Sequence, residues 1–534
     1  MKPIQEWNKY GLMAMLLVAN AAFFALMAWL LPLQYEENDD IMMCMIANGS
    51  YSGTPDFHLV YINVIYGRVL VWLYGLTKAI EWYTLSFAVL HILSMSVLVY
   101  CLVTTPKRAR WEQALWLGIL YVLWARIIVS LQFTTTAGLV CLAGSVLLMR
   151  SSWQSQWTGV VLVVTAALVR FMAAGLVGLL MAPIVLYTHG LRWRRYIPIV
   201  VMLMLVVGCR VVNSRTYQSD PEWKMYREYN QLRAQLNDNP NAYTPEIQEH
   251  LPGGIDKIDY ILLLRFFPDP EQINLEAIRQ LSAAVGSVPF SMQLKNVHRL
   301  DKYAVELSIL LIILALMIMT TGNKRKYLFL LLYSLFVIIL IVYVSLDGFL
   351  KNRVFLCMLL PILFTDFMLL PNTTGRKRKY ALCTVMLLLS GWYIWKTAEA
   401  ADNNYDARIS WRYFDQPLLE CVPDSAYVIT MGTCMNIKAT NPWQVWPYKC
   451  HKYTLGWMTW IPFNTAVASS YRGLMRDDMY VFTTSQYDRP RTIIPRVREQ
   501  IQKHYGLKTE IERIKSNELQ ALIQIRAVAE RDVD

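Results

Sequence analysis

Four acidic residues lie within five positions directly after the first long apolar run of the chain. They are Glu36, Glu37, Asp39 and Asp40, separated only by Asn38. Carboxylates grouped in this way can cap the start of a helix, bind a hard cation through oxygen atoms, or take a proton from a hydroxyl group as a general base. The apolar residues that follow, ending at Gly49, predict a short helix over 38–48 with the two aspartates in its first turn.

The composition shows what surrounds these acids. The chain has 534 residues, of which 55% are hydrophobic and 17% charged, and its mean hydropathy is +0.31. Soluble domains usually carry about 25% charged residues, and apolar runs of about 20 residues recur here, so the sequence predicts a polytopic α-helical membrane protein. The first run, 11–33, has no small-residue cleavage site and indicates an uncleaved anchor.

The basic residues set the expected orientation of the helices. The formal net charge is +12, but lysine and arginine gather in short loops, which is typical of cytoplasmic loops and disfavours a nucleic-acid partner. These loops lie at 107–110, 192–195, 324–326 and 376–379. All of them fall on one side only if residues 58–78, which are apolar but contain Arg68, lie along the outer interface and do not span.

This assignment of the basic loops to one side predicts about 11 membrane spans, with the N-terminus inside and the C-terminus outside. We expect the spans at 11–33, 83–104, 112–130, 137–150, 157–170, 173–189, 196–212, 301–321, 326–346, 353–371 and 379–396. The transmembrane domain is therefore 1–396, with outer loops at 34–82 and 213–300.

The composition changes beyond residue 396. Residues 426–430, 479–484 and 521–528 have the pattern of strands, and 495–506 has the pattern of an amphipathic helix that ends at a glycine. We expect a small α/β domain over 397–534 on the outer face. One disulfide among Cys421, Cys434 and Cys450 is plausible there, and the spacing does not fix the pairing.

Carboxylates at the outer membrane surface suit one particular reaction. A sugar on a polyprenyl phosphate presents its anomeric carbon at the depth of the headgroups, and the phosphate is already a good leaving group. Such a reaction needs a carboxylate to take the acceptor's proton and cations to hold the departing phosphate. Attack opposite the phosphate predicts inversion at the anomeric carbon. The simpler alternative is that the acids cap the helix and are otherwise solvated.

The arrangement of these elements resembles the GT-C glycosyltransferases, integral-membrane enzymes that use polyprenyl-phosphate-linked sugars. The shared features are a first helix that starts inside, an outer loop that opens on Asp39-Asp40, a short helix that ends at Asn48-Gly49, and an interfacial helix. The resemblance covers 35–85 in sequence and about seven helices in arrangement. It implies that the catalytic acid is Asp39 or Asp40. We expect Glu36 and Glu37 to be solvated residues that precede this pair.

Some metal-dependent members of this family bind a divalent ion through Asp-x-Asp, and that pattern is not clean here. We therefore expect a metal-independent enzyme without a cofactor or metal site, while a divalent cation stays an alternative. The loop within 213–300, especially 256–273, corresponds in position to one that closes over the donor. Four tryptophans of the C-terminal domain could stack on sugar rings or belong to the core. They are Trp443, Trp446, Trp457 and Trp460.

Several cations are candidates for the donor phosphate. Lys351 and Arg353 lie in the tight outer turn before the 353–371 span, and Arg353 resembles a late-helix arginine that contacts the lipid phosphate in the family. Arg170 lies at the outer end of the 157–170 span. For the turn with Arg353, an arginine that merely reaches outer-leaflet headgroups is the alternative.

Three further residues could shape the acceptor site because they follow the acidic helix closely in sequence. These are Asp56, His58 and Arg68. A single histidine in a loop is more often structural, and Arg68 on an interfacial helix is expected to contact headgroups.

The sequence thus predicts an inverting membrane glycosyltransferase that moves a sugar from a polyprenyl-phosphate carrier to a glycan, lipid or protein acceptor. The alternatives are a transporter or flippase, or a ligase or polymerase, of lipid-linked glycans. Few acids fall inside the spans, which disfavours transport. The compact loops indicate a bacterial inner (plasma) membrane, with the N-terminus cytoplasmic and the C-terminal domain periplasmic or extracellular.

Overall fold

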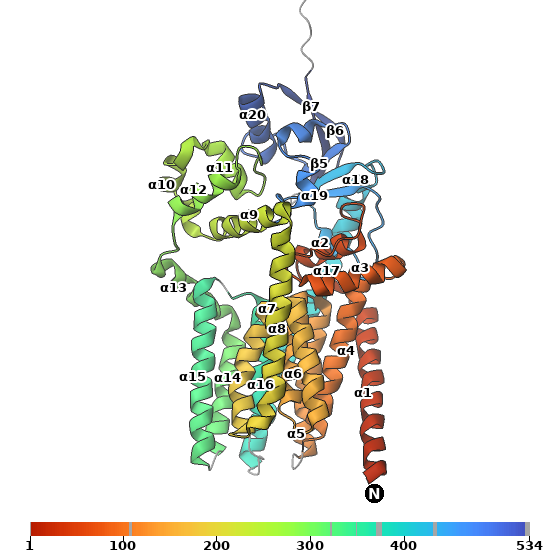
Figure 1. Ribbon diagram of the computed structural model, residues 1–534, viewed down its shortest axis with the longest axis vertical. Coiled ribbons are helices and arrows are strands. Elements are labelled where there is room, and N and C mark those ends of the chain that lie inside the picture. The colour runs from red at the N-terminus through yellow and green to blue at the C-terminus, as the bar shows by residue number, and fades with distance from the viewer. Residues whose placement is uncertain are drawn as a thin grey trace, which may run out of the picture.

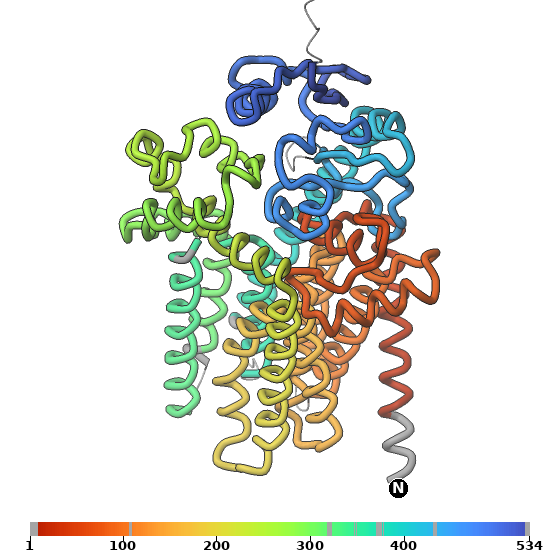
Figure 2. The backbone as a smooth tube through the Cα atoms, turned by 45° about the horizontal axis from the view of Figure 1, so that its top comes forward, coloured from red at the N-terminus to blue at the C-terminus, as the bar shows by residue number. Residues whose placement is uncertain are grey.

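The computed structural model describes residues 2–105, 109–320, 323–348, 350–369, 376–430 and 435–528. Long apolar helices stand side by side as a bundle (Figure 1). One end of this bundle, the head end, carries two short helices, a helical lobe and a sheet domain. The opposite end, the foot end, holds the start of the first helix and, among the described residues, connecting turns such as the one between 189 and 197 (Figures 1 and 2).

Within the described residues, the bundle is formed by helices from both halves of the chain. They are α1 (Lys2–Leu30), α4 (Trp82–Val103), α5 (Arg110–Val129), α6 (Phe133–Leu148), α7 (Trp153–His189), α8 (Ile197–Ser219), α14 (Ala304–Thr320), α15 (Lys324–Asp347), α16 (Asn352–Leu369) and α17 (Arg376–Ser410). Within the described residues, eight helical segments are long and apolar enough to cross a membrane, so the chain is an integral membrane protein. The count of about 11 spans stays a prediction. Of the basic loops, residues 107 and 108 lie outside the described residues.

The helix α7 reverses direction at Arg170, where φ is −155° and ψ is 101°. Near its start, Gln156 Nε2 donates to the carbonyl of Arg150 at 3.0 Å, and near its end Thr188 Oγ1 contacts Met149 Sδ at 3.9 Å. Both ends of α7 therefore lie at the same end of α6. This agrees with the two separate segments expected at 157–170 and 173–189.

Glycines let α6 and α7 pack closely. A Cβ atom on Gly144 would lie 2.9 Å from the Gly159 carbonyl oxygen, and one on Gly159 would lie 2.6 Å from that of Gly144. Small residues at such crossings allow the backbones of membrane helices to approach each other. The tight pair holds the start of α7 against the last turns of α6.

The predicted helix at 38–48 is α2 (Asn38–Asn48), and Gly49 ends it with φ of 84°. Its N-cap residue, Glu37, makes no side-chain capping hydrogen bond, so the acids do not act as an N-cap. Every residue of this helix from Asp40 to Asn48 is buried within the protein. The sheet domain covers it, with Thr454 Oγ1 3.5 Å from Met42 Sδ.

The interfacial helix is α3 (Val64–Leu76), which lies across the head end of the bundle (Figure 1). It is shorter than the 58–78 expected. Asn63 caps its start by accepting a hydrogen bond from the Ile65 N–H. Residues 58–63 are not helical and include bends, with Val60 at φ of 63°. Gly67 of α3 packs directly on Phe57, where a Cβ would lie 2.3 Å from the carbonyl oxygen.

Residues 213–300, expected as a polar loop, are mostly helical. After α8 the chain forms α9 (Pro221–Asn237), α10 (Pro245–Glu249), α11 (Lys257–Leu264), α12 (Leu275–Val285) and α13 (Phe290–His298). These helices form the helical lobe, and buried aromatic residues of α9 join it to the sheet domain. The Tyr226 hydroxyl donates to the Trp457 carbonyl at 3.1 Å, and Tyr229 stacks on Trp460.

The C-terminal domain is a small α/β unit, as predicted. Its sheet has the order β4-β3-β5-β7-β6, with β3 parallel to β4 and β5, and β7 antiparallel to β5 and β6. The strands are β3 (Tyr427–Thr430), β4 (His451–Thr454), β5 (Met479–Thr484), β6 (Thr509–Ser516) and β7 (Gln520–Ala527), accompanied by α18 (Gln416–Leu419), α19 (Pro462–Thr465) and α20 (Ile493–Tyr505). The strands β4 and β6 were not predicted, because both are largely polar.

The boundary between the bundle and the C-terminal domain differs from the predicted one. The helix α17 runs through the boundary expected at residues 396 and 397 and continues to Ser410. Cys421 and Cys450 are free thiols, and Cys434 lies outside the described residues. At the junction with the bundle, β1 (Gln34–Tyr35) pairs in parallel with β2 (Ser130–Leu131), which fixes the acidic segment beside the start of α6.

Candidate functional site

A cavity of about 940 Å³ opens at the head end between α2, the helical lobe and the sheet domain. On the side near the bundle it is lined by Glu37, Asn38 and Asp39 at the start of α2. Tyr61 and Trp457 form part of its walls. Such a concave site with a few converging polar groups is where a ligand is expected.

Asp39 is half-buried and lines this cavity. Burial raises the pKa of its carboxyl above the usual value, while Arg353, a hydrogen bond from the Trp457 side chain and Lys351 oppose that rise. A carboxylate in this environment is a stronger base than an exposed aspartate and still has access to a ligand.

Asp40 has a different environment, because successive residues of a helix point about 100° apart. Its side chain is fully buried, and Oδ1 accepts hydrogen bonds from the Tyr83 hydroxyl at 3.0 Å and the Phe133 N–H at 3.1 Å. Burial raises the pKa of this carboxyl well above the usual value. Since Phe133 is the first residue of α6, Asp40 holds three elements together and does not line the cavity.

The three predicted phosphate cations gather around the acids from the bundle side. Arg353, in the first turn of α16, pairs with Glu37 at 2.5 Å and is 13% exposed. Glu37 is therefore more than the solvated residue expected from the sequence. The Arg170 guanidinium lies 5.1 Å from the centroids of the Tyr61 and Phe133 rings. Lys351 is exposed just before α16 and acts electrostatically on Asp39.

The three residues expected to shape the acceptor site do not line the cavity. His58 Nδ1 lies 2.8 Å from Asp56 Oδ1, and its ring stacks on Trp223 at 4.4 Å between centroids. The Arg68 guanidinium lies over the Phe57 ring at 4.8 Å. His58 and Asp56 therefore fix the connection between α2 and α9, and Arg68 is an exposed residue of α3.

Three further cations, which the sequence pattern did not single out, line the cavity from the helical lobe and the sheet domain. These are Arg233 from α9, Arg265 directly after α11, and Arg496 from α20. Arg265 lies within 256–273 and Arg496 within the predicted helix 495–506, so both segments were recognised. Nothing in the local pattern indicates that two such distant segments meet across one cavity.

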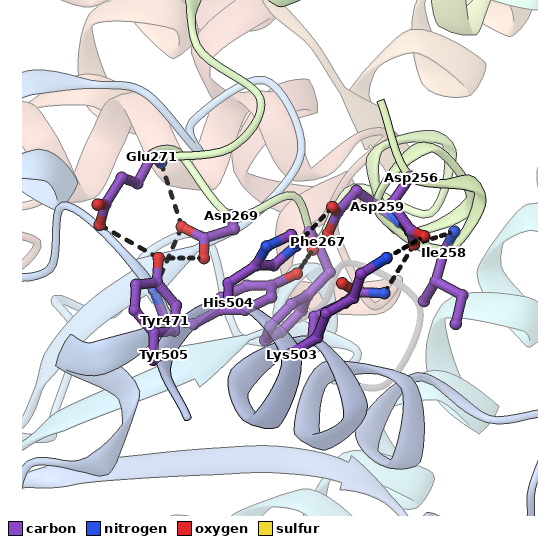
Figure 3. A network of polar contacts seen from close by, with 11 residues as sticks. Asp256, Ile258, Asp259, Phe267, Asp269, Glu271, Tyr471, Lys503, His504 and Tyr505 are labelled. Atoms are coloured by element: carbon purple, nitrogen blue, oxygen red, sulfur yellow. Dashed lines mark hydrogen bonds and ion pairs between the residues drawn. The ribbon is translucent and has the colours of Figure 1, made fainter. Parts of the chain in front are cut away.

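A polar clasp holds the membrane-distal side of the cavity together (Figure 3). Consecutive residues of α20 each bind an acid of the lobe: Lys503 pairs with Asp256 at 2.6 Å, His504 with Asp259 at 2.8 Å, and the Tyr505 hydroxyl with Asp269 at 2.6 Å. Tyr471 adds a hydrogen bond from its hydroxyl to the Phe267 carbonyl at 2.5 Å. The lobe and the sheet domain thus close over the cavity as one unit.

Replacing His504 with alanine should loosen this closure. The change leaves the Asp259 carboxylate, whose side chain is 4% exposed, without its partner, which costs about 1–3 kcal/mol. Hydrogen exchange at α11 should accelerate accordingly, whereas the exposed neighbour substitution Gln502→Ala should leave it unchanged. Equal exchange in the two variants would show that the clasp does not hold the lobe.

In the part of the chain that the structure describes, no group of three or more His, Cys, Asp or Glu side chains is arranged to hold a metal ion. Asp39 lies beside Glu37, but their charged neighbour is an arginine. Independence of metal stays a prediction.

No family model and no curated protein matches the chain. Two solved structures do, both of ArnT from Cupriavidus metallidurans, a GT-C glycosyltransferase. The structure bound to undecaprenyl phosphate is 13% identical with a TM-score of 0.40, over 97% of this chain and 98% of that one. The apo structure is 14% identical with a TM-score of 0.39, over 96% and 98%. A likeness this loose transfers neither a residue role nor a reaction.

Proposed function

We propose that this protein is an inverting glycosyltransferase that moves a sugar from a polyprenyl-phosphate carrier to an acceptor hydroxyl or similar group at the outer face of the membrane. The observation that carries the proposal is the position of Asp39. It is a half-buried carboxylate with a raised pKa, it faces a large cavity at the head end, and Arg353, Arg170 and Lys351 approach it from the bundle.

Each group has a defined task in this reaction. Asp39 takes the proton from the acceptor as the acceptor oxygen bonds to the anomeric carbon and the bond from that carbon to the phosphate oxygen breaks. Arg353, with Lys351 and Arg170, stabilises the charge on the departing polyprenyl phosphate. In this mechanism the acceptor attacks the anomeric carbon opposite the departing phosphate, so the configuration inverts.

The test is transfer by the purified full-length protein in nanodiscs from a panel of polyprenyl-phosphate-linked sugars. NMR of the product should show the anomeric configuration opposite to that of the donor, and activity should survive a chelator. Retention of configuration would exclude the mechanism, and loss of activity with the chelator would establish the metal-dependent alternative.

The pH dependence of kcat/KM should depend on the charges around Asp39. Since the raised pKa of its carboxyl makes protonation easier, kcat/KM should fall on the acidic side at a pH above the ordinary range of an aspartate. Arg353 lowers that pKa, so Arg353→Gln should move the acidic limb to higher pH and Arg353→Lys should not. If kcat/KM falls at the same acidic pH in both variants, Asp39 is not the group that titrates beside Arg353.

The proposed location predicts accessibility to membrane-impermeant reagents. Cysteines placed at Val69 on α3 and at Trp193 in the foot-end turn, both exposed, should label from opposite sides in a cysteine-free background. In a bacterial cell, position 69 should react from the periplasmic or extracellular side. Labelling of both positions from one side would contradict the orientation.

A further inference from the structure

Three arginines of the helical lobe and the sheet domain line the cavity. They are Arg233, Arg265 and Arg496, each from a different element. Among the described residues, no carboxylate lies within ion-pair distance of any of them. Arg233 hydrogen-bonds the Asn230 side-chain oxygen at 3.1 and 2.9 Å, which leaves its charge uncompensated.

Neighbouring cations on the same lobe and domain behave differently. Arg279 pairs with Glu228 at 2.5 Å, Lys503 with Asp256 at 2.6 Å, and Arg476 with Asp478 at 2.7 Å. Acids are therefore plentiful in this region, yet none neutralises the arginines of the cavity. Like charges that converge on one concavity repel each other and create a positive potential that attracts an anion.

We propose that the acceptor carries an anionic group, a phosphate or a carboxylate, and that Arg265 and Arg496 bind it together with Arg233. This inference rests on the proposed function. The donor phosphate is tied to the membrane and has its own cations, Arg353 among them, on the bundle side of Asp39. The three arginines belong to the helical lobe and the sheet domain, outside the bundle, and bind the second substrate.

The distribution of charge also orients that substrate. Glu37 and Asp39 repel an anion from the membrane-proximal side of the cavity, and the arginines attract it to the distal side. An acceptor with one anionic end can then enter in only one direction, with its reacting group toward Asp39. Planar guanidinium groups suit this task because they bind phosphate and carboxylate oxygens in pairs.

Binding can be tested without turnover, using the full-length protein in nanodiscs of neutral lipid and two soluble probes, glucose 6-phosphate and glucose. The parent protein should bind glucose 6-phosphate at least about tenfold more tightly than glucose. The Arg265→Gln/Arg496→Gln double variant should lose this preference. Arg353→Gln and the matched control Arg491→Gln, an exposed arginine outside the cavity, should keep it, as should Asp39→Asn.

Equal affinity for both probes in the parent, or a preference that disappears in Arg353→Gln and persists in the double variant, would overturn the inference. In the transfer assay the double variant should raise KM for the acceptor at least about tenfold and leave KM for the donor unchanged. A rise in the donor KM alone would also overturn it. Transfer lost in Asp39→Asn but unaltered in the double variant would refute the inference and leave the proposed function intact.

Discussion

Replacing Asp39 with asparagine should lower the rate of sugar transfer by about two to four orders of magnitude, the usual contribution of a general base. Asparagine keeps the size of the side chain and cannot take a proton. The carboxylate is half-buried and lines the cavity, so the variant should fold normally. The loss should appear in kcat, with little change in the KM of the donor.

The matched control is Asp40→Asn, the same chemical change one residue further along α2. Because Asp40 is fully buried and does not line the cavity, its asparagine variant should retain most of the parent rate. Thermal unfolding of both variants separates catalysis from folding. If Asp39→Asn transfers sugar at more than about a tenth of the parent rate, Asp39 is not the base.

The sequence contained enough to locate the acidic helix and the basic residues of the bundle, because both depend on local patterns. The helix over 38–48 has acids in its first turn and a glycine after its last residue, and it forms over those residues. The reversal near Arg170 follows from two adjacent apolar runs. The positions of Arg353 and Lys351 follow from the short turn between two such runs.

The local sequence pattern does not distinguish the role of Asp39 from that of Asp40. Both follow the same apolar run, and only the packing of α2 against α4 and α6 shows that Asp40 binds Tyr83 and Phe133 while Asp39 remains in the cavity. The arginines of the lobe and of α20 were missed for a similar reason. Their meeting depends on the clasp between residues about 245 positions apart, which no periodicity encodes.

Replacing Asp40 with alanine should cost about 2–6 kcal/mol of unfolding free energy, in contrast to the small effect of asparagine at the same position. Alanine leaves the Tyr83 hydroxyl and the Phe133 N–H, both buried, without an acceptor, at about 1–3 kcal/mol each. Asparagine retains one acceptor oxygen. It also resembles the neutral carboxyl that the raised pKa of Asp40 favours.

The pH dependence of stability provides an independent measurement. Because the folded-state pKa of Asp40 is raised above its unfolded value, the contribution of this carboxyl to stability is fully present below the unfolded pKa. It is lost as pH rises through the folded pKa. The parent should therefore lose stability relative to Asp40→Asn as pH increases, whereas the exposed substitution Asp402→Asn on α17 should leave the difference from the parent nearly constant. Equal unfolding midpoints for the Asp40→Ala, Asp40→Asn and parent proteins would mean that Asp40 does not hold α2, α4 and α6 together.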